Sequence, residues 1–210
     1  MEVHSPHSPI HSVKEFMVHL LAITIGLLIA LGLESSVEWV HHRHLARDAR
    51  ENIFQEVRAN QQQVVRQLKA LPAEEKRLDE ILRFVEDTQH GRPTKPLGDF
   101  MWTSILLHDS AWAAASSTGA IGFMSYDEVK RYSRLYAVQQ INGSILERNL
   151  ADRHEMNVLL VRMQSAGKLS DAEFESGKRT ILSAKIRELE FNEIDTDLNE
   201  AYAKLLSQEK

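Results

Sequence analysis

The sequence has no cysteine among its 210 residues. This absence excludes disulfide bonds and metal sites built from thiolates, so the chain is indifferent to the redox state of its compartment. The 5 prolines lie in the N-terminal tail, at Pro72 and within residues 91–98. Long stretches free of proline and glycine favour helix. No stretch alternates apolar and polar residues as a β-strand does, so we predict an all-α fold.

An excess of basic residues is also missing. The chain has 25 basic and 30 acidic residues, for a net charge of −5. Proteins that bind nucleic acid usually carry a basic surface, so we expect no nucleic-acid partner. Hydrophobic residues make up 43% and charged residues 26% of the chain, which is ordinary for a folded protein and excludes a disordered one.

Residues 16–33 form the longest run without a formal charge. As a helix these 18 residues extend about 27 Å, close to the ~30 Å hydrocarbon core of a bilayer. We therefore predict one N-terminal transmembrane helix over 16–33. Two alternatives stay open: a buried core helix, and a cleaved signal peptide, for which Ala30-Leu31-Gly32 fits the small-x-small cleavage rule.

Small residues recur every fourth position within this run, at Ala22, Gly26 and Ala30. This spacing places them on one helix face, where two helix backbones can approach closely. The pattern predicts a homo-oligomer formed through the membrane helix.

Aromatic and cationic residues follow the run and predict contact with lipid headgroups: Trp39, His41, His42, Arg43 and His44. Lys14 is the only basic residue before the run, whereas three arginines follow it by residue 50. Counting these charges favours a cytoplasmic C-terminal part.

The rest of the chain divides by its helix signals. Prolines make residues 1–15 a flexible tail. The 3.6-residue apolar period over 34–71 predicts a juxtamembrane amphipathic helix. Pro72 suits the first turn of a new helix, and Gly91 its end. We expect 72–210 to form an antiparallel bundle, with about five helices in all after the membrane helix.

Further helix starts are marked by capping residues. Asp99 is placed to cap a helix over the apolar segment that follows it. Ser125 with Glu128, and Ser170 with Glu173, have the spacing of a capping box. The last helix ends with apolar residues at coiled-coil spacing: Phe191, Ile194, Leu198, Tyr202 and Leu205.

Catalytic motifs are weak. Glu38 and His41 have the Glu-x-x-His spacing of di-iron bundles, but a second such motif and two further carboxylates are missing. His108, Asp109 and Ser110 are adjacent on the chain and cannot form a hydrolytic relay. We therefore expect no catalytic residue, no metal, no cofactor and no enzyme activity, with a metal-dependent enzyme as the least favoured alternative.

A ligand pocket is a further alternative, formed by aromatic residues and one histidine: Trp102, His108, Trp112, Tyr132 and Tyr136. The run 110–122 consists almost entirely of small residues. Such a run lets another helix pack directly on it, so we expect a bulky residue at Ala114 to overpack a close contact.

Several short motifs occur together: residues 25–31 (IGLLIAL), Trp39, Trp112 followed after five residues by Thr-Gly-Ala, residues 124–128 (MSYDE) and Leu135-Tyr136. In these the chain resembles a group of bacterial single-pass membrane proteins of unknown function. The resemblance implies the bacterial inner (plasma) membrane and a helical domain outside the cytoplasm. The chain departs from the basic N-terminal flank of that group, so the side of the soluble domain stays open.

These observations together predict a membrane-anchored helical interaction module, such as a scaffold or accessory subunit. Its expected partners are the lipid bilayer, a second copy and an unknown protein. The alternative function is a ligand-sensing helical bundle.

Overall fold

The computed structural model describes residues 13–98, 102, 104–164 and 168–207. Within these ranges it contains helices and connecting segments and no strand, which confirms the all-α prediction. The elements are α1 (Val13–Gln89), α2 (Ser110–Ser117), the 3₁₀ helix η1 (Ala120–Phe123), α3 (Tyr126–Gln164) and α4 (Asp171–Ser207). The described ranges thus hold four α-helices, and the prediction of five helices after a separate membrane helix is wrong. The predicted tail lies outside these ranges up to residue 12, and α1 begins at Val13.

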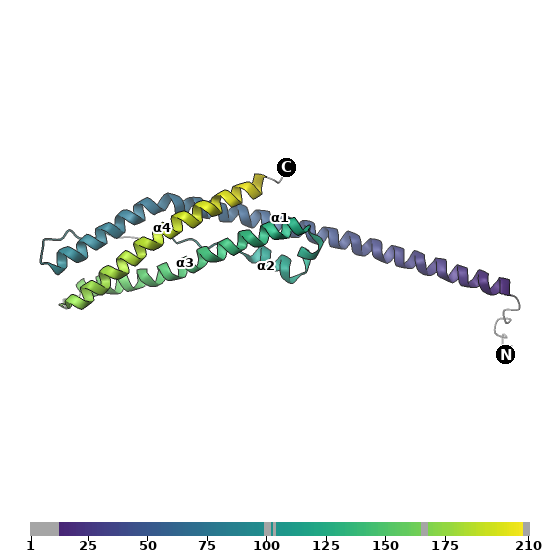
Figure 1. Ribbon diagram of the computed structural model, residues 1–210, viewed down its shortest axis with the longest axis horizontal. Coiled ribbons are helices and arrows are strands. Elements are labelled where there is room, and N and C mark those ends of the chain that lie inside the picture. The colour runs from purple at the N-terminus through teal and green to yellow at the C-terminus, as the bar shows by residue number, and fades with distance from the viewer. Residues whose placement is uncertain (1–12, 99–101, 103, 165–167, 208–210) are drawn as a thin grey trace, which may run out of the picture.

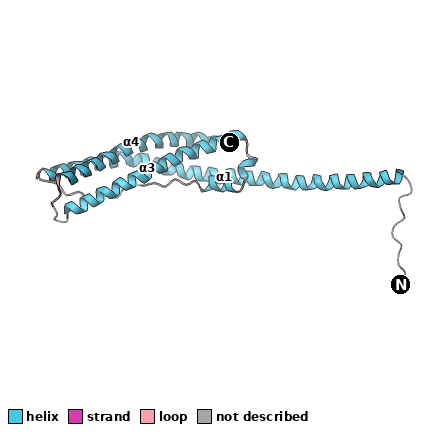
Figure 2. Cartoon of the chain, turned by 60° about the horizontal axis from the view of Figure 1, so that its bottom comes forward, coloured by secondary structure: helices cyan, strands magenta, loops and turns pink. Residues whose placement is uncertain are grey.

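Three long helices lie side by side in the left part of the molecule, and the N-terminal part of α1 extends alone to the right (Figures 1 and 2). The start of α3 packs against the middle of α1, and the end of α3 packs against the end of α1. In contrast, the end of α4 packs against the middle of α1. Helices α1 and α3 therefore run parallel, and α4 is antiparallel to both.

Helix α1 has two halves of different surroundings. Every residue from Val13 to His41 is exposed, including the whole apolar run. From Ala46 onward the helix buries one residue in each turn: Ala46, Ala49, Ile53, Val57, Asn60, Val64, Gln67, Leu71, Glu74, Leu78, Ile81 and Val85. The first half is long and apolar enough to cross a membrane, and its most apolar window is 0% buried within the chain. One continuous helix therefore joins this stretch to the bundle.

The expected helix boundary at Pro72 is wrong, because α1 continues through it. Proline cannot donate the hydrogen bond to the carbonyl of Leu68 and disfavours a helix interior. Buried residues on both sides offset this cost: Leu71 and Leu78 are in the core, and Glu74 is bonded to Arg153 on α3. The chain leaves α1 where predicted, at Gly91 with φ of 66°.

The apolar segment before α2 is also not helical as predicted. Residues 102 and 104–109 form a connecting strap, and the helix begins only at Ser110; Asp99 lies outside the described residues. The strap buries Ile105, whereas Leu106 is 67% exposed. It returns the chain from the end of α1 to the start of α3, which allows those two helices to be parallel.

Both predicted capping boxes are confirmed. The backbone N–H of Ser125 donates to Oε2 of Glu128 over 2.9 Å, and the N–H of Glu128 donates to Oγ of Ser125 over 3.3 Å. The N–H of Ser170 donates to Glu173 over 2.8 Å in the same way. These bonds satisfy N–H groups that a helix start leaves without partners.

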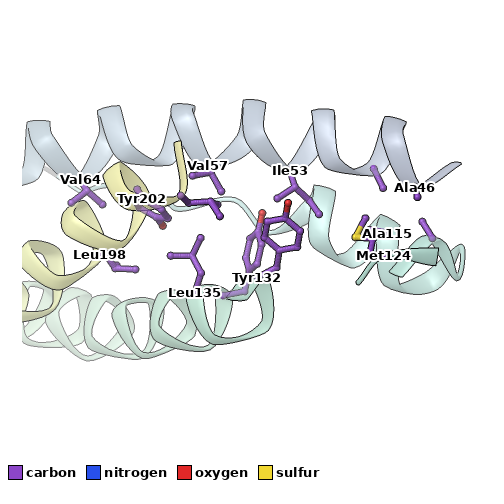
Figure 3. Close-up of a cluster of buried hydrophobic side chains, with 14 of the residues drawn as sticks. Ala46, Ile53, Val57, Val64, Ala115, Met124, Tyr132, Leu135, Leu198 and Tyr202 are labelled. Carbon is purple, nitrogen blue, oxygen red and sulfur yellow. The ribbon is translucent and has the colours of Figure 1, made fainter. Parts of the chain in front are cut away.

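The core near the start of α3 is drawn in Figure 3. Side chains from α1 point between α3 and α4, where Leu135, Leu198 and Tyr202 meet them. A second cluster fills the far end of the bundle around Leu78, Ile81, Met156 and Phe174. Buried polar residues lie between and beside these apolar clusters: Asn60, Gln67, Glu74, Gln139, Asn142, Asn149, Arg153, Glu188 and Asp195.

Candidate functional site

Three of the five predicted pocket residues meet in the bundle. Trp112 stacks on Tyr136 with ring centroids 5.6 Å apart, and it lies 6.3 Å from the ring of Tyr132. Both tyrosines are only 2% exposed and belong to the main hydrophobic cluster. These rings are packed against one another, as aromatic pairs in cores usually are. They therefore form part of the hydrophobic core.

Glu56 connects this aromatic cluster to the start of α2. Its Oε1 accepts a hydrogen bond of 2.7 Å from the hydroxyl of Tyr136. Its Oε2 accepts bonds from Oγ of Ser110 over 2.7 Å and from the N–H of Ala111 over 2.9 Å. Burial, together with the Glu56 carboxylate, raises the pKa of Tyr136, so the phenol stays a donor. Glu56 therefore holds α1, α2 and α3 together.

His108 belongs to the site through its backbone and not its ring, which is exposed. Its carbonyl accepts bonds from the side-chain amides of Asn60 over 2.7 Å and Gln139 over 2.8 Å. Its N–H donates to Oδ1 of Asn60 over 2.9 Å. Tyr202 of α4 donates to the oxygen of Gln139 over 2.8 Å. We call Asn60, Gln139 and Tyr202 the polar clamp, because they fix the strap against all three long helices.

Trp102, the fifth predicted pocket residue, lies apart from the others in the far cluster. The guanidinium of Arg153 lies 4.6 Å from the centre of its ring. Arg153 also donates to Glu74 over 2.6 Å and to Glu188 over 3.2 Å, and all three charged groups are buried. Burial raises the pKa of Glu188, and the neighbouring Glu74 adds to this effect while Arg153 opposes it.

Asp195 is a second buried acid that the sequence analysis did not single out. It is 0% exposed, and its Oδ1 accepts a 2.6 Å bond from the amide of Asn142. Among the described residues its Oδ2 has no hydrogen-bond partner. Burial raises its pKa to about 7, against the lowering effect of Asn142. The carboxyl is therefore partly protonated near neutral pH.

A groove of about 470 Å³ lies between α1 and the segment of α2 and η1, outside the aromatic cluster. Its α1 side carries Asp48, Asn52, Gln55 and Glu56 together with the apolar Leu45 and Ala49. Its other side is formed by small residues: Ser110, Ala111, Ala114, Ala115, Thr118 and Ala120. Ala114 is exposed, whereas Ala115 and Ala120 are buried. The expectation that a helix packs over Ala114 is therefore wrong within the described chain.

The residues predicted to contact headgroups lie where the exposed N-terminal half of α1 meets the bundle. The guanidinium of Arg43 lies 5.2 Å from the centre of the Trp39 ring. His42 stacks on Phe123 of η1 with centroids 3.8 Å apart, and His41 is exposed. His44 accepts a 3.0 Å bond from Arg47. The ring of His42 therefore connects this set to the folded bundle.

The predicted association face on α1 is open. Ala22, Gly26 and Ala30 are exposed, and a Cβ added at Gly26 meets nothing within 4 Å. Among the described residues, no group of three or more histidine, aspartate or glutamate side chains could hold a metal ion. Glu38 and His41, the pair with Glu-x-x-His spacing, are both exposed on the N-terminal half of α1.

The sequence contains a signal for the buried charge of Arg153. Asn149, Arg153, Met156 and Leu160 repeat at three- and four-residue steps, so a charged residue occupies a core position of α3. Comparison with known proteins adds no assignment: no protein-family model, no curated protein and no solved structure matches this chain.

Proposed function

We propose that the protein is a single-pass membrane protein that holds a three-helix bundle at the bilayer surface and acts by interaction, as a scaffold or accessory subunit. The continuity of α1 carries this proposal. Exposure of an apolar helix to water is unfavourable, and transfer of the same surface into lipid lowers its free energy. The same helix then supplies one third of the bundle core.

The bundle is suited to a fixed spatial role. Its strap and helices are joined by partly buried side-chain hydrogen bonds at the polar clamp and by the buried ion pairs of Arg153. Bonds of this kind favour one packing arrangement over others. A rigid bundle on an unbroken helix positions a binding surface at a constant height above the membrane. The bacterial inner membrane is the proposed location.

A ligand-sensing bundle is the second candidate. The groove beside Glu56 favours it, because its volume falls in the range of small-molecule sites and it contains a few polar groups beside an apolar wall. Glu56 is bonded to α2 and α3, so a ligand that competes for this carboxylate would alter the contact between helices.

The anchor is tested by alkaline carbonate extraction of membranes that contain the full-length protein. The wild type is expected to stay with the membranes. The double variant Ile25→Arg/Leu28→Arg should be released, because each central arginine costs about 2.5–3.5 kcal/mol on insertion. The control Leu182→Arg/Leu189→Arg also places arginines at exposed apolar positions, but on α4, and should remain bound. Release of the wild type refutes the anchor.

The interaction role is tested separately by chemical cross-linking in intact membranes. A scaffold or accessory subunit should give discrete adducts through the bundle, to a second copy or to another protein. A chain that stays monomeric and uncross-linked at every reagent concentration contradicts this role, whatever the carbonate result.

A further inference from the structure

A second groove lies between the start of α3 and the end of α4, on a different side of the bundle from the groove beside Glu56. Its volume is about 270 Å³. Four apolar side chains form its floor: Leu135, Val138, Ala201 and Leu205. Three cations line its rim: Arg131, Arg134 and Lys204. The groove thus combines an apolar floor with a cationic rim, although the chain as a whole has a net charge of −5.

The three rim cations are exposed, and among the described residues no ion pair within 4.0 Å joins any of them to a carboxylate. By contrast, Arg50 at this end of the bundle pairs with Glu128 at 2.6 Å. Asp197 and Glu200 precede Lys204 on α4 by about two turns and one turn. On α3, Asp127 precedes Arg131 by about one turn. None of these three carboxylates is among the ion-pair partners of the rim cations in the described part of the chain.

We propose that this groove binds a single-chain anionic amphiphile, a molecule with one carboxylate or phosphate on an apolar body. Arginine pairs with both anions through two parallel hydrogen bonds, which supplies recognition of the head. The apolar floor accepts the body. The volume lies just below the usual range for drug-sized ligands, so it fits one short chain and not a two-chain lipid or a protein helix.

The ligand reaches the groove from water. Tyr132 lies between Arg131 and Arg134 in sequence. The centre of its ring is 6.5 Å from the centre of the Phe54 ring on α1, so Phe54 marks the height of the groove along α1. Phe54 follows Leu33, the last residue of the apolar run, by 21 residues, which is about 31 Å along a helix. Headgroups extend only about 5–8 Å beyond the hydrocarbon core. This step alone rests on the proposed membrane span; the binding itself does not.

The test is calorimetric titration of the full-length protein in nanodiscs with decanoate and with decyl phosphate. Decyltrimethylammonium serves as the cationic probe with a similar chain. Replacing Arg131, Arg134 and Lys204 by glutamine should weaken binding of both anions at least about tenfold, as the loss of three exposed charge contacts allows. The control triple variant, with Arg66, Lys69 and Lys168 replaced by glutamine, removes the same charge from other exposed positions and should leave the affinity within about twofold.

A second variant examines the floor without changing charge. Ala201→Phe fills the exposed part of the groove and should abolish binding of both probes while all three cations remain. The proposal is overturned if neither anion binds the wild type, if the cationic probe binds as tightly, or if the control triple variant loses the same affinity. Binding of only decanoate or only decyl phosphate identifies the head group. Carbonate extraction reports on the membrane span independently of every one of these results.

Discussion

Replacing Asp195 by asparagine should stabilise the protein at alkaline pH. The carboxyl is 0% exposed, and among the described residues its Oδ2 has no hydrogen-bond partner. Its pKa is raised from 3.8 to about 7 in the folded chain, so the folded state holds the proton more tightly than the unfolded state. The stability that the protonated Asp195 carboxyl contributes is therefore fully present below about pH 4, and it is lost as the pH rises through about 7.

A shift of this size corresponds to about 4 kcal/mol at 1.36 kcal/mol per pKa unit, and relaxation of the buried site reduces it to roughly 2–4 kcal/mol. Asparagine keeps an oxygen for the bond from Asn142 and carries no charge. At about pH 8 the Asp195→Asn variant should unfold roughly 5–15 °C above the wild type, with a smaller difference at about pH 5.

Thermal unfolding followed by circular dichroism at both pH values measures this difference. Asp197→Asn is the matched control, because Asp197 is an exposed carboxylate two residues away on the same helix, and its effect should stay below about 0.5 kcal/mol. An Asp195→Asn variant with the same dependence on pH as the wild type would refute the reasoning.

Three further variants examine the packing. Arg153→Met leaves Glu74 and Glu188 buried without their cation, so it should lower the free energy of unfolding, measured by chemical denaturation, by about 3–5 kcal/mol. Changing both glutamates to glutamine in the same chain should recover part of this loss. Asn60→Ala removes two hydrogen bonds to the backbone of His108, so it should lower the free energy of unfolding by about 1–3 kcal/mol and speed amide exchange in the strap. The control Gln62→Ala, at an exposed position, should do neither. Ala115→Leu overpacks a residue that is 3% exposed and should cost about 1–3 kcal/mol, whereas Ala114→Leu, at an exposed neighbour, should cost under about 0.5 kcal/mol; equal costs would contradict the placement of α2.

Local signals in the sequence predicted the fold where one segment decides the outcome. The capping boxes at Ser125 and Ser170 require only residues three positions apart, and both are present. The stop near Gly91 depends on one residue that adopts positive φ. The all-α class follows from periodicity along each helix.

Predictions failed where distant residues decide the outcome. Pro72 suggests a helix start, but packing of Leu71 and Leu78 and the bond that Arg153 donates to Glu74 keep α1 unbroken. The apolar strap reads as helix, yet Asn60 and Gln139, far away in sequence, hold the backbone of His108. Of the five residues proposed for a pocket, Trp112, Tyr132 and Tyr136 do meet, but their rings pack directly against one another. This packing depends on how α2 lies beside α3, which the sequence alone does not show.

The proposed anchor depends on the continuity of α1 from its exposed N-terminal half into the bundle. The chain has no cysteine, so spin labels can be placed at Val37→Cys and Gln62→Cys without removing any native thiol. Both positions are exposed on α1 and lie 25 residues apart. Pulsed electron paramagnetic resonance on the full-length protein in nanodiscs should give a single narrow distance distribution near about 37 Å between the labelled backbone positions, as an unbroken helix requires. A broad distribution, or one centred well below this distance, would show a hinge in α1 between Val37 and the bundle and would contradict the continuity of this helix.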